Sequence, residues 1–177
     1  MNRPNEQRPD NWKTEIFLIR EAAAVDASAI AALLKDAFAE FEALYTAEAF
    51  AATVVPESMV RERIKVGPVW IATKESAAVG TVAALCEVDS VMVRGMAVAP
   101  GARGFGLAQA LLGVTENFAR KQGYQRLSLY TTPFLRQAIH LYEKSGFRFT
   151  GDTHNPHGTE LLRMVKELPA KTGTPKL

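Results

Sequence analysis

The chain has 177 residues, of which 47% are hydrophobic and 23% charged, and this suits one globular domain with a sizeable core. Its 21 basic and 19 acidic residues leave a net charge of +2, which is too small to indicate a nucleic-acid-binding surface. The sequence has a polar beginning and no apolar run of about 18 residues, the length that crosses a membrane. A cytoplasmic protein without nucleic-acid or membrane partners is therefore predicted.

The first third of the chain is expected to form a strand and two helices after a polar arm. Residues 1–12 contain two prolines and are typical of a flexible arm, and a strand is expected over 16–20. Asp26 is expected to cap the next helix, and a shorter helix is expected over 56–64, after the less regular segment 40–55. The first helix has one apolar face that predicts core packing: Ile30, Leu33, Leu34, Ala37, Phe38 and Phe41.

The middle of the chain predicts three antiparallel strands, a glycine-containing loop and a helix. The strands are expected over 69–73, 77–88 and 91–98, because each run is apolar and the turns between them are short. A helical stripe then extends over 107–123. Cys86, the single cysteine, has no activating neighbours in its strand and is expected to be a buried, unreactive thiol.

The last third adds a strand over 126–131, a helix that begins at Pro133 and is stopped by Gly146, and two strands over 147–150 and 160–166. Residues 169–177 form a polar tail that is expected to be flexible.

The order of these elements predicts one α+β domain over residues 13–168. Its sheet is expected to be mixed, mostly antiparallel and twisted, with about seven strands flanked by about four helices. The strand-helix-strand unit around the glycine loop is expected to supply the parallel pair, because a parallel connection needs a crossover.

The glycine loop has the composition of an anion-binding turn. Gly101, Gly104 and Gly106 let the backbone approach an anion, and the first N–H groups of the following helix have no partner inside the helix. The Walker phosphate-loop pattern is absent, and Gln109 stands where a dinucleotide fingerprint needs its third glycine. The loop alone leaves anion binding and a plain strand-to-helix turn both open.

Two segments resemble the motifs of the GNAT superfamily of N-acetyltransferases. Arg103-x-x-Gly106-x-Ala108 resembles the acetyl-CoA signature Arg/Gln-x-x-Gly-x-Gly/Ala, and residues 138–147 resemble the later segment Ala-Ile-x-Leu-Tyr-x-x-x-Gly-Phe. The two motifs follow each other at the family's usual separation, with a helix and a strand between them. The resemblance implies a GNAT-like fold and an enzyme that transfers the acetyl group of acetyl-CoA, its cosubstrate, to a primary amine by direct attack, without a metal.

The resemblance also implies roles for individual residues. The backbone of 96–98 pairs with the pantetheine amides, the N–H groups of 103–108 hold the pyrophosphate, and Tyr142 is the general acid that protonates the departing thiolate. The alternatives are a solvated surface charge for Arg103 and an ordinary core residue for Tyr142. The implied cofactor-binding residues are Met96, Ala97, Val98, Arg103, Gly104, Phe105, Gly106, Leu107, Ala108, Leu135 and Ala138.

Two positions depart from the family pattern. Leu135 stands where many relatives have an asparagine that contacts CoA, and Met92 stands where some relatives have a glutamate base. The base is therefore unassigned, with water, Glu87 or a residue of the less regular region as candidates. These departures keep a second hypothesis open, that of a non-catalytic acyl-CoA-binding or regulatory module.

The acceptor amine is not specified by the motifs. Glu42 is suited to attract an amine, although a solvent-facing helical glutamate is the ordinary alternative. His154 and His157 lie in a loop with Asp152, and their spacing favours surface histidines over a zinc site. A homodimer is left open. The candidate acceptor-contacting residues are Phe41, Glu42, Tyr45 and Glu87.

Overall fold

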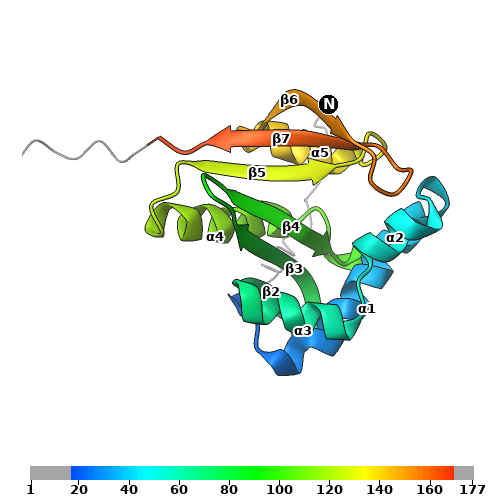
Figure 1. Cartoon of the computed structure of the whole chain (residues 1–177). Helices are drawn as coiled ribbons and strands as arrows, with labels where there is room; N and C mark the ends of the chain where they lie inside the picture. The colour runs from blue at the N-terminus through cyan, green and yellow to red at the C-terminus, as the bar shows by residue number, and fades with distance from the viewer. Residues whose placement is uncertain (1–16, 170–177) are drawn as a thin grey trace, which may run out of the picture.

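A computed structural model describes residues 17–169, so the expected arm at 1–12 and nearly all of the expected tail at 169–177 lie outside the described residues. The described chain forms one seven-stranded sheet with helices on both faces (Figure 1). The strands are β1 (Leu18–Glu21), β2 (Val69–Lys74), β3 (Ala77–Cys86), β4 (Val91–Val98), β5 (Arg126–Thr131), β6 (Arg148–His154) and β7 (Leu161–Glu167).

Five α-helices and three short 3-10 helices complete the described fold. The α-helices are α1 (Ala27–Phe38), α2 (Ala47–Thr53), α3 (Glu57–Val66), α4 (Leu107–Lys121) and α5 (Arg136–Lys144). The 3-10 helices are η1 (Ala24–Asp26), η2 (Ala39–Leu44) and η3 (Pro100–Ala102). The expectation of an α+β fold with a mixed, mostly antiparallel sheet is confirmed. The helix missing from that expectation is α2, which is too short for a periodic apolar signal and begins where Thr46 Oγ1 accepts the Ala49 N–H at 3.2 Å.

The strand order is β1-β2-β3-β4-β5-β7-β6, and β4–β5 is the parallel pair, as expected for the crossover through α4. This pair is short. Residues 91–93 of β4 pair with 127–129 of β5, and the two strands then diverge toward their carboxyl ends (Figure 1). Among residues 17–169, the remainder of β4 pairs only on its β3 side, so its other edge faces an opening in the middle of the sheet.

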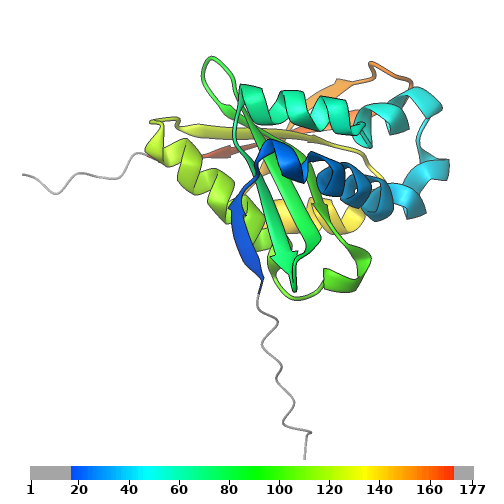
Figure 2. The ribbon, with the colours of Figure 1, turned by 90° about the horizontal axis from the view of Figure 1, so that it is seen from below.

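The two faces of the sheet are covered by different helices (Figures 1 and 2). Successive residues of a strand point to opposite faces, and the neighbours Ala83 and Ala84 accordingly belong to different clusters of buried side chains. One cluster joins the sheet to α1 and α3 through residues such as Ile30 and Val60. The other joins the sheet to α4 and α5 through residues such as Leu111 and Tyr142.

Two local expectations are wrong. Cys86 is exposed, because β3 ends there and the chain turns away at Glu87 instead of continuing the strand to residue 88. Asp26 precedes α1 but makes no side-chain cap. Its carboxylate instead binds both terminal nitrogens of Arg20 at 2.8 Å and accepts the Ala23 N–H at 2.7 Å, and the hydrogen bond from Arg20 lowers the pKa of Asp26. Among residues 17–169, no helix is both long and apolar enough to cross a membrane.

Candidate active site

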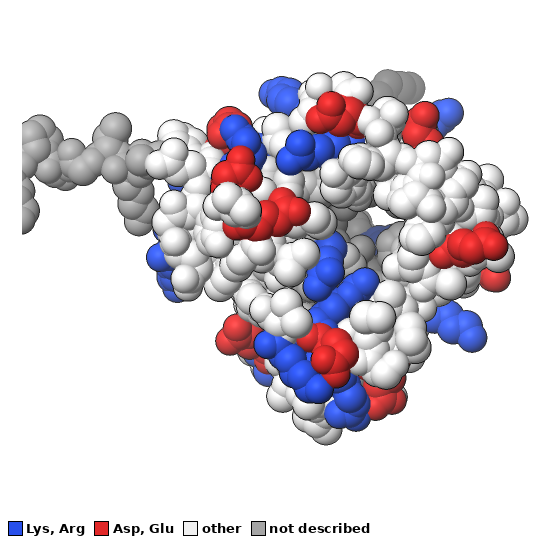
Figure 3. Space-filling view, viewed as in Figure 1, with Lys and Arg blue, Asp and Glu red and all other residues white. Residues whose placement is uncertain are grey.

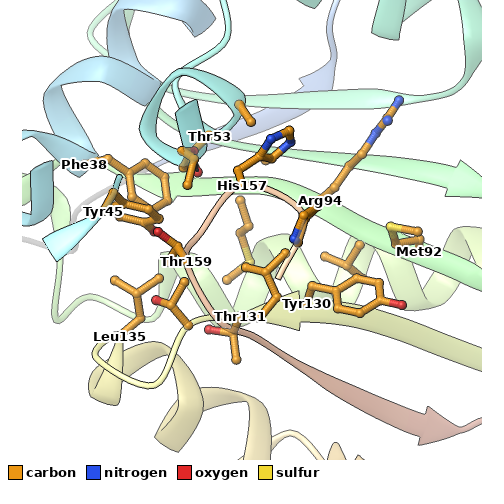
Figure 4. A pocket seen from close by; sticks show the side chains of 18 of the residues that line it. Phe38, Tyr45, Thr53, Met92, Arg94, Tyr130, Thr131, Leu135, His157 and Thr159 are labelled. Carbon is orange, nitrogen blue, oxygen red and sulfur yellow. Dashed lines mark hydrogen bonds between the residues drawn. The ribbon is translucent and has the colours of Figure 1, made fainter. Parts of the chain in front are cut away.

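The opening between β4 and β5 contains a cavity of about 550 Å³. Its walls come from the segment between the end of α1 and α2, from α3, from the two diverging strands, from α5 with the loop before it, and from the loop between β6 and β7 (Figure 4). In Figure 4, Tyr45 and Leu135 lie at one end of the cavity, and Arg94 and Met92 lie at the other. A cavity of this size, closed by several elements, suits a small ligand or the end of a chain.

A β-bulge shapes the floor of this cavity. Thr81 pairs with Ala97 and Ala83 pairs with Arg94, so two residues of β4, Gly95 and Met96, stand opposite the single residue between Thr81 and Ala83. Gly95 has a φ of +56°, which L-residues rarely adopt, and both bulged residues line the cavity.

The edge of β4 after the bulge is suited to pair with an extended ligand. Within the described chain no strand pairs with 94–98 on the β5 side, so an added strand-like group meets unpaired backbone there. Of the three residues expected to pair with pantetheine, Met96 lines the cavity, Ala97 is buried against α1, and Val98 is half-buried. Their common backbone edge, rather than their side chains, is what faces the opening.

The glycine loop presents free donors next to the start of α4. Gly104 and Gly106 have φ values of +86° and +78°, and Gly106 immediately precedes the 15-residue helix α4. Within residues 17–169, the N–H groups of 104–108 have no hydrogen-bond acceptor. Phe105 is exposed and its ring lies 6.4 Å from that of Phe17. A turn of unpaired amides at the positive end of a helix dipole is suited to hold phosphate.

Arg103 does not point freely into solvent. Its Nη2 donates to the Ala37 carbonyl at 3.0 Å, its Nε donates to the Val98 carbonyl at 3.3 Å, and Nη1 forms an ion pair with Glu40. The side chain therefore ties the glycine loop to the end of α1. Phosphate binding by this guanidinium stays a prediction, and the backbone amides of the loop are donors that no group of the described chain occupies.

Tyr142 lies on α5 with its side chain in the cavity wall and is 8% exposed. Its ring meets the edge of the Phe147 ring with 5.8 Å between centroids, which fixes its orientation. Burial raises the pKa of Tyr142 to about 12, and the nearby Tyr45 adds to the rise. The phenol is thus kept in its proton-donating form, and it shares the cavity with the bulge of β4.

The remaining expected residues divide between the cavity and other places. Leu135 and Tyr45 line the cavity, and Ala138 packs on the core behind it. The rings of Tyr45 and Phe134 meet edge to face, with 4.8 Å between their centroids. Burial raises the pKa of Tyr45. His157 also lines the cavity.

Three of the candidate acceptor-contacting residues are placed elsewhere. Glu42 borders a different surface hollow, and Phe41 is half-buried outside the cavity lining. The Glu87 carboxylate accepts hydrogen bonds from Ser90 Oγ at 2.7 Å and Ser128 Oγ at 3.2 Å, and it does not line the cavity. Glu87 is therefore occupied as a link between the β3–β4 turn and β5.

Sequence reasoning missed the two arginines of the cavity, Arg63 on α3 and Arg94 on β4. Arg94 is a charged residue inside an otherwise apolar strand, and that anomaly was a usable signal. Arg63 had none, because α3 carries several charged residues and only the tertiary structure shows which one turns inward. His154 lies beside Tyr130, with 5.3 Å between ring centroids. In the described part of the chain, no three His, Cys, Asp or Glu side chains gather closely enough to hold a metal ion.

Residues 28–168 match the family described as "Acetyltransferase (GNAT) domain". The fold is that of this class, and the chain belongs to the GNAT acetyltransferase family, as the two motifs implied. The structure is similar to the PaiA N-acetyltransferase of Thermoplasma acidophilum in complex with coenzyme A, with a TM-score of 0.73, 15% identity, and coverage of 86% of this chain and 99% of that one. It is equally similar to the Escherichia coli ribosomal-protein-S18-alanine N-acetyltransferase, with a TM-score of 0.73, 17% identity, and coverage of 92% and 100%.

Curated relatives match a shorter part of the chain. A mouse protein named "Probable N-acetyltransferase family 8 member 5" is 37% identical over 91 residues, which are 48% of this chain and 40% of that protein. The zebrafish N-acetylaspartate synthetase is 38% identical over 88 residues, which are 49% of this chain and 31% of that protein. The matched segments thus span less than half the length of these relatives.

Proposed function

We propose that the protein transfers the acetyl group of acetyl-CoA to the primary amine of a small molecule or peptide. The observation that carries the proposal is the position of the buried Tyr142 phenol, in a cavity that opens where β4 leaves β5. Within the described chain, the unpaired edge of β4 is suited to pair with the pantetheine amides of CoA. The free amides of the glycine loop are suited to bind its pyrophosphate. The Thermoplasma neighbour, described as a complex with coenzyme A, supports the same cosubstrate.

The chemistry follows from the groups in the cavity. The neutral amine attacks the thioester carbonyl carbon, so that a C–N bond forms and the C–S bond breaks. The nitrogen releases one proton, and the thiolate takes one proton from Tyr142, whose phenol is reprotonated from solvent. We assign stabilisation of the developing oxyanion to backbone N–H groups at the Gly95–Met96 bulge, because both bulged residues line the cavity. The products are the N-acetylated amine and free CoA.

No aspartate or glutamate of the described chain lines the cavity, and Glu87 is bound to two serines elsewhere. We therefore assign removal of the amine proton to solvent, with His157 as the cavity side chain that is chemically able to assist. A non-catalytic acyl-CoA-binding module is the second candidate, because a carboxylate base and the asparagine at position 135 are both missing.

Calorimetric titration with acetyl-CoA, followed by thiol-release assays over a panel of amines, tests the proposal. We expect binding and turnover in the unchanged protein, and roughly ten-fold weaker acetyl-CoA binding in Gly106→Ala, because an L-residue at a φ of +78° costs about 1–2 kcal/mol and turns the loop amides. Gly101→Ala is the matched control, since Gly101 has no neighbour within 4 Å and is not among the positive-φ glycines. Binding without turnover on the whole panel would favour the module, and absence of binding would eliminate both candidates.

The pH dependence of kcat provides a separate prediction. An ordinary tyrosine, with a pKa of about 10, would begin to lose its proton near pH 9. Burial raises the pKa of Tyr142 to about 12, so the acid form persists at higher pH. At saturating acceptor we expect kcat to be flat or to rise from about pH 7 to about pH 9.5, as more amine becomes neutral. A loss of kcat between about pH 8.5 and 9.5 in the unchanged protein would contradict this role of Tyr142.

A further inference from the structure

Two arginines line the cavity without any acidic partner among the described residues. Arg63 comes from α3 and Arg94 from β4, and both line the cavity. In the described part of the chain neither forms an ion pair or a hydrogen bond, and Arg94 Nε is a buried donor without an acceptor. Figure 3 shows basic side chains bordering the hollow at the centre of this face. Other arginines of the chain do find carboxylates: Arg20, Arg61, Arg103, Arg120, Arg126 and Arg163.

The placement of these two charges is costly for the protein alone. Burial lowers the pKa of Arg63 to about 10, and the charge of Arg94 contributes to the same shift. Burial also lowers the pKa of Arg94. Two like charges that are partly removed from water, one of which has a buried Nε without an acceptor among the described residues, destabilise the empty site. An anion that enters the cavity would remove that cost by accepting the free donors.

The backbone of β4 is adapted to bring one guanidinium to the reaction centre. A Cβ built on Gly95 would lie 2.9 Å from Arg63 Nη1, so the Arg63 guanidinium rests directly against the bulge. The same bulge supplies the backbone donors assigned to the oxyanion. The anion site and the acyl-transfer site are therefore neighbours, within the reach of one small acceptor.

The rest of the lining favours an acceptor with an apolar body. Phe38, Met92, Tyr130 and Leu161 add apolar side chains to the lining, and the Thr131 hydroxyl is buried without a partner among the described residues. No carboxylate of the described residues is available in the cavity to bind a second ammonium group. Polyamines therefore fit the cavity poorly, whereas a molecule with one amine, one anionic group and an apolar side chain fits it well.

We propose that the acceptor is an amine that carries a free carboxylate, of the amino-acid class, whose carboxylate binds Arg63 and Arg94 while its amine faces the bulge at Gly95. The planar guanidinium matches a carboxylate with two parallel hydrogen bonds, which orients the acceptor as well as binding it. This proposal rests on the proposed acetyl transfer and specifies its substrate class.

The test compares each proteinogenic amino acid with the amine that lacks only its carboxylate, such as L-phenylalanine with phenethylamine and L-leucine with 3-methylbutylamine. Thiol release is measured at saturating acetyl-CoA. At least one amino acid should exceed its matched amine in kcat/KM by about 10- to 100-fold, the range expected when a charge-assisted hydrogen bond is lost. Arg63→Met and Arg94→Met should remove this preference by lowering kcat/KM for the amino acid and not for the matched amine, mainly because KM for the amino acid rises. Arg94→Lys should retain part of the preference.

The control is Arg61→Met, on the same helix, where the guanidinium is exposed and pairs with Glu57 at 2.6 Å. It should leave the preference unchanged. A thermal melt separates binding from folding: without acceptor, Arg94→Met should melt no lower than the unchanged protein, because it removes an unpaired buried charge. Equal turnover of amino acids and matched amines, or equal losses for both in the arginine variants, would overturn the carboxylate assignment and leave acetyl transfer standing. Failure to bind acetyl-CoA, or binding without thiol release from either series, would overturn both proposals.

Discussion

Replacing Tyr142 by phenylalanine should lower kcat by about 100- to 1,000-fold, the usual contribution of a positioned general acid. Phenylalanine keeps the ring that packs against Phe147 and removes only the hydroxyl, which makes no protein hydrogen bond among the described residues. The dissociation constant for acetyl-CoA should therefore stay within about two-fold, and the loss should appear in kcat and kcat/KM alike. Single-turnover thiol release, with calorimetry for the binding step, measures both quantities.

Two variants show whether this effect is specific. Tyr124→Phe removes a phenol outside the cavity lining, which interacts with Cys86, and it should leave kcat unchanged. Tyr45→Phe removes a half-buried phenol of the same cavity. If the large loss occurs in Tyr45→Phe and not in Tyr142→Phe, the acid is Tyr45 and the role assigned to Tyr142 is wrong.

Replacing Gly95 by alanine should damage both stability and acceptor use. A non-glycine residue at a φ of +56° costs about 1–2 kcal/mol, so the free energy of unfolding should fall by that amount. The new Cβ would also lie 2.9 Å from Arg63 Nη1, so this guanidinium must move from the bulge. We expect kcat/KM for the best acceptor to fall by at least about ten-fold, since bulge donors and the Arg63 side chain are displaced together.

Gly113→Ala is the matched control for Gly95→Ala. Gly113 lies inside α4 with no neighbour within 4 Å of an added Cβ, and alanine there should raise the free energy of unfolding by about 0.5–1 kcal/mol. Denaturant melts give the stabilities and steady-state assays give kcat/KM. A Gly95→Ala protein with unchanged acceptor kinetics would show that the bulge is not part of the acceptor site.

Much of the fold was predictable because its signals are local. The strands at 91–98 and 126–131 have the expected bounds, since their apolar runs are ended by Pro100 and by the turn at Pro133. The parallel pairing of these two strands followed from the helix between them. The phosphate-type loop and the segment around Tyr142 were also recognisable, because each is one short run of sequence.

The acceptor side was not predictable, because it depends on contacts between distant segments. Arg103 pairs with Glu40, which is 63 positions away in the chain, and no periodicity reports such a contact. Arg63 and Arg94 become neighbours only in the folded chain, where the Arg63 side chain of α3 reaches the β4 bulge at Gly95. Glu87 was a reasonable candidate by residue type, but Ser90 and Ser128 already occupy its carboxylate. Whether a charged side chain can bind a ligand therefore depends on whether other protein groups already bind it, and not on its residue type alone.

The short seam between β4 and β5 has a mechanical consequence. The sheet consists of two ribbons, β1 to β4 and β5 to β7, which are joined by the pairing of residues 91–93 with 127–129. Each ribbon keeps its own hydrogen bonds whatever the angle between them, so a change in that angle breaks nothing within either ribbon. The width of the cavity, and with it the distance between Tyr142 on one side and the bulge at Gly95 on the other, therefore depends on the angle between the two ribbons, which share strand pairing only at this seam within the described chain.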